Sequence, residues 1–317
     1  MKKVLLVLLS VLVFSCLVIY IFIPGKINIT SSTIIPTTDI GVERFITDEN
    51  KWEKWWNYNN PHANPTNPEH AKAFISNRDT FKLFNKYYKS ADIWIHTHER
   101  ELVSKLVIIS LTQDSTGIEW ASPLLMGSDP YTRLTRYLQA KNLKKSMDTV
   151  LANLKAFLSK SENIYGIPFE RNRLKDTLYF TAKNLLQTRP STTEIYGLIK
   201  KLQSYASKNS IKQTGNPIYN ITEMDKNRFQ LMAAIPVEKS LKEADGFSMK
   251  HMVKGSFIIS EVVGGDSAVS MASKNLHQYF QDFHKTSMAM NFTMLVTDRI
   301  LQTDSSKWIT RLYMPVY

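Results

Sequence analysis

The chain has 317 residues, 43% of them hydrophobic, so it can bury sizeable cores and is longer than one ordinary domain needs. It has no low-complexity tract, which excludes a disordered chain. Its 40 basic and 28 acidic side chains give a net charge of +12, but the basic residues are spread out and no nucleic-acid-binding motif is present. We therefore interpret the charge as a solvated basic surface and expect no nucleic-acid partner.

An uncharged apolar stretch, Val4 to Ile23, follows Lys2 and Lys3 at the amino terminus. Twenty residues of helix span roughly 30 Å, the thickness of the hydrocarbon core of a bilayer. We predict an uncleaved membrane anchor over residues 1–25, with a cytoplasmic amino terminus because of the two lysines and a soluble part on the periplasmic side. Cys16, the single cysteine, leaves a lipoprotein cleavage site as the alternative.

The next stretch, residues 26–162, predicts one strand, two short helices, several strands and a long helix. The strand covers Lys26 to Pro36, and the helices fall between Thr37 and Trp56 with a break near Asp48. Strands are expected between Thr80 and Gly127. Asp129 and Pro130 then suit the N-cap and first position of a helix. Leu134, Leu138, Met147, Val150, Leu151, Leu154 and Leu158 fall on one face of that helix.

Several short motifs in this half resemble the START-like (SRPBCC, polyketide-cyclase-like) superfamily. They are Pro36 at the end of the first strand, Trp52-Glu53-Lys54-Trp55 after Asp48, Thr116 to Trp120, and Leu151 to Lys155. The resemblance implies a helix-grip domain over residues 26–162, in which the long helix covers a curved antiparallel sheet and encloses an apolar cavity.

His96 and His98 form a possible metal-ligand pair, because alternate residues of a strand point to the same face. A metal site needs a third ligand, and no other residue is clearly placed to supply one. We therefore predict no metal and no cofactor.

The remaining stretch, residues 163–317, contains one unit twice: strand, helix, strand, strand. In the first copy, Ser191 and Glu194 form a capping box in front of a helical apolar face, and two strands follow, Pro217 to Asp225 and Arg228 to Val237. In the second copy, two strands, Asn291 to Asp298 and Lys307 to Val316, repeat this ending. Two such units side by side predict a pseudo-twofold α+β domain with a groove at its seam.

This half resembles the GyrI-like domain, a small-molecule-binding module that also serves as the effector domain of bacterial transcription activators. The resemblance rests on Gly215 to Tyr219, Ala234 to Val237, Gly264-Gly265, Thr297-Asp298, and Trp308 to Val316. It implies that residues 163–317 bind a ligand.

One departure from that family bears on the chemistry. The family has a glutamate and a tyrosine shortly before its Thr-Asp pair, where this chain has Thr293 and Leu295. Without the carboxylate, a buried cation would have no charge partner and a hydrolytic mechanism would have no acid–base group. The candidate groove residues are Tyr219, Phe257, Glu261, Thr293, Leu295, Trp308 and Tyr313. Ordinary core packing is the alternative for each aromatic, and a solvated strand position is the alternative for Glu261.

No nucleophile–base set, phosphate loop or helix-turn-helix is found in the sequence, so no catalytic residue is assigned. We predict a membrane-anchored, non-catalytic protein that binds a neutral or weakly polar hydrophobic small molecule. One alternative is a hydrolase or cyclase that uses the START-like cavity or Glu261, and another is an envelope interaction protein.

Overall fold

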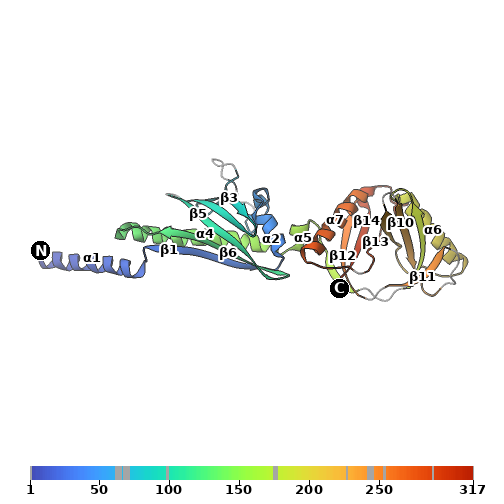
Figure 1. Ribbon diagram of the computed structural model, residues 1–317, viewed down its shortest axis with the longest axis horizontal. Coiled ribbons are helices and arrows are strands. Elements are labelled where there is room, and N and C mark those ends of the chain that lie inside the picture. The colour runs from blue at the N-terminus through green and yellow to red at the C-terminus, as the bar shows by residue number, and fades with distance from the viewer. Residues whose placement is uncertain are drawn as a thin grey trace. The chain divides into compact units, whose positions relative to one another are not determined.

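A computed structural model describes residues 2–60, 66, 72–97, 100–173, 178–225, 228–240, 246–252, 255–287 and 289–316 (Figure 1). The chain divides into two compact units, Met1–Ile164 and Tyr165–Tyr317. The fold is α+β, with an apolar amino-terminal helix and two antiparallel sheets, which confirms the predicted fold class.

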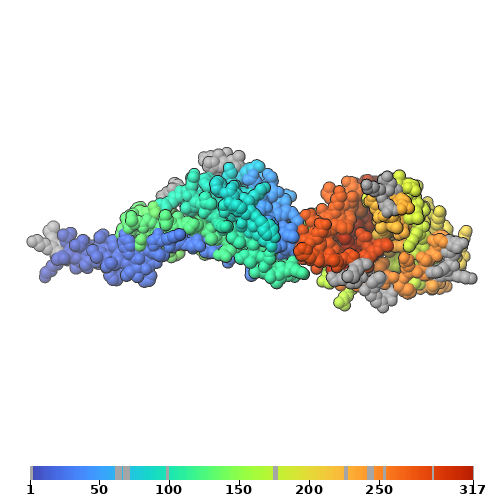
Figure 2. Space-filling model, viewed as in Figure 1, coloured from blue at the N-terminus to red at the C-terminus, as the bar shows by residue number. Residues whose placement is uncertain are grey.

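The first element is the apolar helix α1, Lys2–Phe22, whose segment Lys3–Phe22 is long and apolar enough to cross a membrane. Its large side chains from Val4 to Val13 are all more than half exposed, and in Figure 2 most of the helix stands clear of the rest of the first unit. The end of α1 contacts the start of helix α4: Arg133 lies over the Tyr20 ring at 4.4 Å and donates to the Ile23 carbonyl at 3.2 Å.

The first unit contains a six-stranded sheet in the order β1-β6-β5-β4-β3-β2. Its strands are β1 Lys26–Ile35, β2 Phe74–Ser76, β3 Asp79–Tyr87, β4 Ser90–Thr97, β5 Arg100–Thr112 and β6 Ser115–Leu125. Its helical elements after α1 are α2 Asp39–Ile46, η1 Glu49–Lys51, α3 Trp52–Trp55, α4 Pro130–Leu158 and α5 Ser161–Tyr165. Helix α4 lies along the sheet (Figure 1) and is capped by the Asp129 side chain, as predicted. Its buried stripe begins at Ala140, so Leu134 and Leu138 of the predicted face are exposed.

Aromatic rings fill the interior of this unit. Trp52 and Trp56 stack with ring centroids 5.1 Å apart, and Phe81 links Trp56 to Trp120 at 5.4 and 5.5 Å. All four rings are at most 1% exposed. Trp52 and Trp120, two of the residues behind the START-like resemblance, are therefore part of this packed interior.

The second unit contains an eight-stranded sheet in the order β11-β8-β10-β9-β13-β14-β12-β7. Its strands are β7 Glu170–Arg173, β8 Leu178–Leu186, β9 Ile218–Asp225, β10 Arg228–Pro236, β11 Phe247–His251, β12 Ser256–Val263, β13 Phe292–Leu295 and β14 Ile309–Val316. Its helices are α6 Thr192–Lys208 and α7 Asp266–Asp282, with the short η2 Ser305–Lys307. The predicted repeat is present as β8-α6-β9-β10 and β12-α7-β13-β14, whereas edge strands β7 and β11 were not predicted.

The two repeats meet at the middle of the sheet, where β13 pairs with β9 at two positions, Thr293 with Tyr219 and Met294 with Ile218. Each helix covers its own half. Helix α6 packs on a core that includes Phe180, Leu202 and Leu231, and α7 packs on one that includes Ile258, Leu276 and Met314. The seam strands therefore lie beneath the space between the two helices.

Candidate functional site

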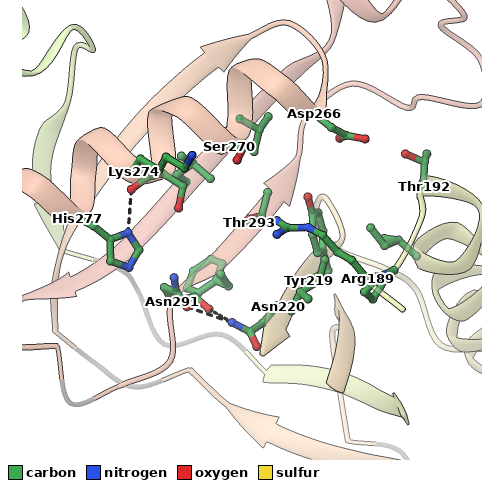
Figure 3. Close-up of a pocket in the computed structure, with 17 residues that line it drawn as sticks. Arg189, Thr192, Tyr219, Asn220, Asp266, Ser270, Lys274, His277, Asn291 and Thr293 are labelled. Carbon is green, nitrogen blue, oxygen red and sulfur yellow. Dashed lines mark hydrogen bonds between the residues drawn. The ribbon is translucent and has the colours of Figure 1, made fainter. Parts of the chain in front are cut away.

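A cavity of about 660 Å³ lies over the seam, between α7 and the beginning of α6 (Figure 3). Strands β9 and β13 supply its floor, α7 one wall, and the segment that leads into α6 the other. Its polar lining residues are Arg189, Thr192, Tyr219, Asn220, Asp266, Ser270, Ser273, Lys274, His277, Asn291 and Thr293. Its apolar lining residues are Pro190, Ile195, Ile221, Val269, Phe292 and Leu312.

The floor of the cavity is formed by Tyr219 and Thr293, which face each other across the pairing of β9 with β13. Burial raises the pKa of the Tyr219 hydroxyl, and nearby Asp266 acts in the same direction, whereas Arg299 and a hydrogen bond with Thr293 oppose the shift. Tyr219 is therefore neutral at ordinary pH. At one end of the floor, the Asn220 amide donates to the Asn291 carbonyl at 2.7 Å. The floor offers hydroxyls and amides but no carboxylate.

The α7 wall carries small and basic side chains on consecutive turns. Ser270, Ser273 and Lys274 line the cavity, and His277 continues the wall with its Nδ1 2.8 Å from the Ser273 carbonyl. From the opposite wall, Arg189 extends its guanidinium toward the centre of the cavity above Tyr219 (Figure 3). Two cations therefore reach this space from opposite walls.

A buried arginine, Arg299, holds one end of the cavity in place. Its side chain is 1% exposed and donates from Nη1 to Asp266 at 2.7 Å and from Nη2 to Thr310 at 3.0 Å. The guanidinium also lies 4.6 Å from the Trp308 ring centroid, while its Nε has no hydrogen-bond partner among the described residues. Asp266, the one carboxylate among the described lining residues, is thus paired with the buried guanidinium of Arg299.

Two of the residues predicted for the groove, Tyr219 and Thr293, line this cavity. Leu295 lies on the same sheet face but is 3% exposed, in the core under α6. Trp308 carries Arg299 on its ring and donates from Nε1 to the Gln302 carbonyl at 2.7 Å. These last two residues support the site from outside its lining.

The other three predicted residues lie on the opposite face of the sheet. Phe257 and Tyr313 belong to a buried cluster there, in which Tyr313 stacks on Phe292 with centroids 4.6 Å apart. Glu261 accepts a hydrogen bond from Arg311 at 2.8 Å, and Glu261 and Tyr313 line a separate cavity of about 480 Å³. Strand alternation explains the division, because neighbouring residues point to opposite faces.

A polar cavity of about 470 Å³ in the first unit contains a buried carboxyl, Asp79. Ser146 of α4 donates to it at 2.6 Å, and Asn77 donates to the Ser146 hydroxyl at 3.1 Å. Burial raises the pKa of the Asp79 carboxyl, and the hydrogen bond from Ser146 acts against that rise. Asp79 and Ser146 both have hydrogen-bond partners among the described residues. We therefore interpret the arrangement as a buried hydrogen-bond network.

The possible histidine pair is only partly visible, because His98 lies outside the described residues. The His96 ring stacks on Trp94 with centroids 5.7 Å apart. Among the residues that the structure describes, no group of three or more histidine, cysteine, aspartate or glutamate side chains is arranged to hold a metal ion.

The sequence did not indicate three basic residues at this site: Arg189, Lys274 and Arg299. Arg189 lies in a loop, Lys274 looks like part of a solvated helix face, and Arg299 follows a turn motif without any pattern of its own. Thr297 and Asp298, which carried the family resemblance, stabilise that turn by accepting from the Ile309 and Ile300 amides, each at 2.9 Å.

Comparison with known proteins yields structural matches only. No protein-family model matches the chain, and no curated protein does. Among solved structures, the chain is similar to the EcmrR chain of an EcmrR–DNA complex, at 14% identity and a TM-score of 0.44 over 59% of this chain and 71% of that one. It is also similar to SAV2435 bound to tetraphenylphosphonium (16%, TM-score 0.35, 48% and 94%). A third match is a hydrolase from Listeria innocua (12%, TM-score 0.37, 47% and 91%).

Proposed function

We propose that this protein is a membrane-anchored binding protein and that its second unit holds a small molecule in the seam cavity. The observation that carries the proposal is the cavity itself: about 660 Å³ between two helices, with polar side chains converging on it from three sides. A concave space of this size with a few converging polar groups is typical of small-molecule sites. The repeat topology and the GyrI-like motifs support the same role.

The lining favours binding over catalysis. Asp266 is the one carboxylate among its described residues, and it is paired with Arg299 at 2.7 Å. Thr293 occupies the position where the GyrI-like resemblance places a glutamate. The hydrolytic mechanism that the GyrI-like resemblance implies needs a carboxylate free to exchange a proton with the substrate. The lining is also mostly polar, so we propose a more polar ligand than the sequence predicted.

Native mass spectrometry of the full chain in detergent tests this proposal. We expect a small molecule to co-purify and to be lost from Ser273→Trp, because an indole on α7 would occupy the cavity. Ser204→Trp is the matched control, since Ser204 is an exposed serine on α6. Equal retention of the molecule by both variants would place its site elsewhere.

Anchoring is supported by the exposure of α1. Its large apolar side chains from Val4 to Val13 are more than half exposed, and such a surface is unfavourable in water. We propose that α1 spans the membrane, with the amino terminus in the cytoplasm and the soluble part outside. Intact-mass measurement of the membrane fraction tests this: retention of the full amino terminus supports an anchor. Loss of residues 1–15 with a lipid-modified Cys16 supports a lipoprotein, and loss of the whole apolar stretch supports a cleaved signal.

We propose that the first unit is START-like, on its motifs and its order of one strand, two short helices, an antiparallel sheet and a long helix. Its aromatic interior favours a structural role over a ligand cavity.

For the enzyme alternative, Glu261 is the candidate acid–base group. Its contact with Arg311 at 2.8 Å favours an ion pair on the strand surface instead. Any measured turnover that Glu261→Gln leaves intact would exclude Glu261 from catalysis.

A further inference from the structure

The charged side chains at the seam cavity are unequally paired. Asp266 is held by the buried Arg299, so these two charges cancel. Arg189 and Lys274 form no ion pair within the described part of the chain, and both are exposed at the mouth of the cavity. Among the residues that the structure describes, the cavity therefore has two uncompensated positive charges and no uncompensated negative one.

The helices reinforce this positive potential. Thr192 is the first residue of α6 and Asp266 the first residue of α7, and both line the same end of the cavity (Figure 3). The amino-terminal end of a helix carries a partial positive charge and free amide groups. Ser191 caps α6, but the N-cap of α7 is Gly265, which supplies no side-chain acceptor. The start of α6 is already satisfied by its capping box with Glu194, so the α7 dipole is the one that favours added negative charge at this end.

Neutral donors and apolar contacts complete the environment. Ser270, Ser273 and Thr293 add hydroxyls, and Tyr219 adds a phenol that stays protonated because burial raises its pKa. Ile195, Val269 and Leu312 leave an apolar surface beside these donors. The cavity is also much larger than a simple inorganic anion requires. An organic body with an acidic head group matches both parts of the lining.

We propose that the ligand of the seam cavity is a small organic acid whose carboxylate is held by Arg189 and Lys274. This inference rests on the proposed binding function and specifies its ligand class. Charge-assisted hydrogen bonds from a guanidinium and an ammonium are stronger than bonds from neutral donors. A lipophilic cation would instead meet two like charges, without the carboxylate that the GyrI-like resemblance implies.

Three probes of the same shape test the charge preference: benzoate, benzamide and benzamidinium, which share one ring and a planar head group. We expect the full chain in detergent to bind benzoate at least about tenfold more tightly than benzamidinium, with benzamide between them. Added salt should weaken benzoate binding and leave benzamide binding unchanged, because the two cations are exposed to solvent.

Variants assign the preference to the two cations. Arg189→Gln and Lys274→Gln should each lower benzoate affinity by roughly three- to tenfold and leave benzamide affinity unchanged. Lys201→Gln is the matched control, since Lys201 is an exposed lysine on α6 outside the lining. Thr293→Glu should reverse the order and favour benzamidinium.

The outcomes separate this inference from the proposed function. If benzamidinium or benzamide binds as tightly as benzoate, the organic-acid class is overturned while binding in the cavity stands. If inorganic phosphate competes for the site as well as benzoate does, the site recognises negative charge alone. The inference that the ligand has an organic body then fails. If none of the probes binds and no molecule co-purifies with the chain, both proposals fail.

Discussion

The two helices of the second unit have the same length and equivalent places in their repeats, yet they bury different amounts of apolar surface. Helix α6 buries Ile195, Tyr196, Leu198, Ile199, Leu202 and Ala206. Helix α7 buries Ala272, Leu276 and Phe280 as its apolar residues. Aligned from their first residues, Leu202 corresponds to Leu276, while Tyr196 and Ile199 of α6 correspond to Ser270 and Ser273 of α7.

The cavity therefore lies beside α7, whose side chains at these positions are smaller and more polar than those of α6. Both helices keep the central leucine that attaches them to their half of the sheet, and each is 0% exposed. At the positions nearer the seam, α6 fills the space with a tyrosine and an isoleucine, and α7 leaves it open with serines. The two repeats share one scaffold, and the residues in which their helices differ form the site.

The largest loss of stability should come from replacing Ile199 of α6 with serine, the residue that α7 has at the equivalent position, Ser273. Ile199 is 1% exposed, and Ile199→Ser would leave a gap and bury a hydroxyl in the core. We expect the second unit to lose about 2–5 kcal/mol of unfolding free energy. Hydrogen exchange of the α6 and β10 amides would measure the loss. Ser273→Ala on α7 is the matched control and should change stability by less than about 0.5 kcal/mol. A similar loss in both variants would contradict the comparison.

A smaller loss should follow Asp266→Asn at the first turn of α7. This change leaves the Arg299 side chain, 1% exposed, without its carboxylate. Because the Asp266 side chain is itself 68% exposed, we expect a cost of about 1–2 kcal/mol in the same exchange measurement. Glu261→Gln is the control, because it breaks an ion pair whose two side chains are 47% and 44% exposed and should cost at most about 1 kcal/mol. Equal losses would show that burial of Arg299 is unimportant.

The two helix starts differ as well. Ser191 and Glu194 form the predicted capping box on α6, and Ser191→Ala should cost about 1 kcal/mol. Hydrogen bonds from the Ser191 amide and hydroxyl lower the pKa of Glu194 below its ordinary value of 4.5. This contribution to stability is therefore present above the unfolded pKa and is lost as the pH falls through the lower folded value. Thermal unfolding across that range should show a weaker pH dependence in Ser191→Ala, and an unchanged pH dependence would count against the box.

The smallest effect should be a gain at the start of α7. Its N-cap residue, Gly265, has a φ of −77°, so a side chain is allowed there, and the nearest atom to an added Cβ is the Ser305 Cβ at 3.4 Å. Gly265→Ser should stabilise the unit by a few tenths of a kcal/mol, because the hydroxyl would cap an amide that now has no side-chain acceptor. A lower midpoint of thermal unfolding would mean that the new side chain clashes with Ser305.

The sequence predicted the parts of this fold that depend on local patterns. The repeat, the Ser191 capping box and the Asp129 helix start all follow from residues close together in the chain. The cavity depends on residues that only the folded sheet brings together, such as Arg189 and Lys274. Ser270 and Ser273 look in sequence like an ordinary polar face, since nothing local shows that they face the neighbouring repeat. The predicted groove mixed both sheet faces for the same reason: Thr293 and Tyr313 lie on different strands, and only their register separates them.

The short pairing between β9 and β13 has a mechanical consequence. Strands β12 and β14 pair along their whole length, from Ser256–Val316 to Val263–Ile309, whereas the seam pairs at Thr293–Tyr219 and Met294–Ile218. On one face of the seam, Ile218 packs in a buried cluster with Phe257 and Tyr313, and the other face borders the cavity. Two paired positions resist a change in strand angle less than eight do, so we expect bending at the seam to change the distance between α6 and α7. We expect such bending to adjust the width of the cavity to ligands of different girth.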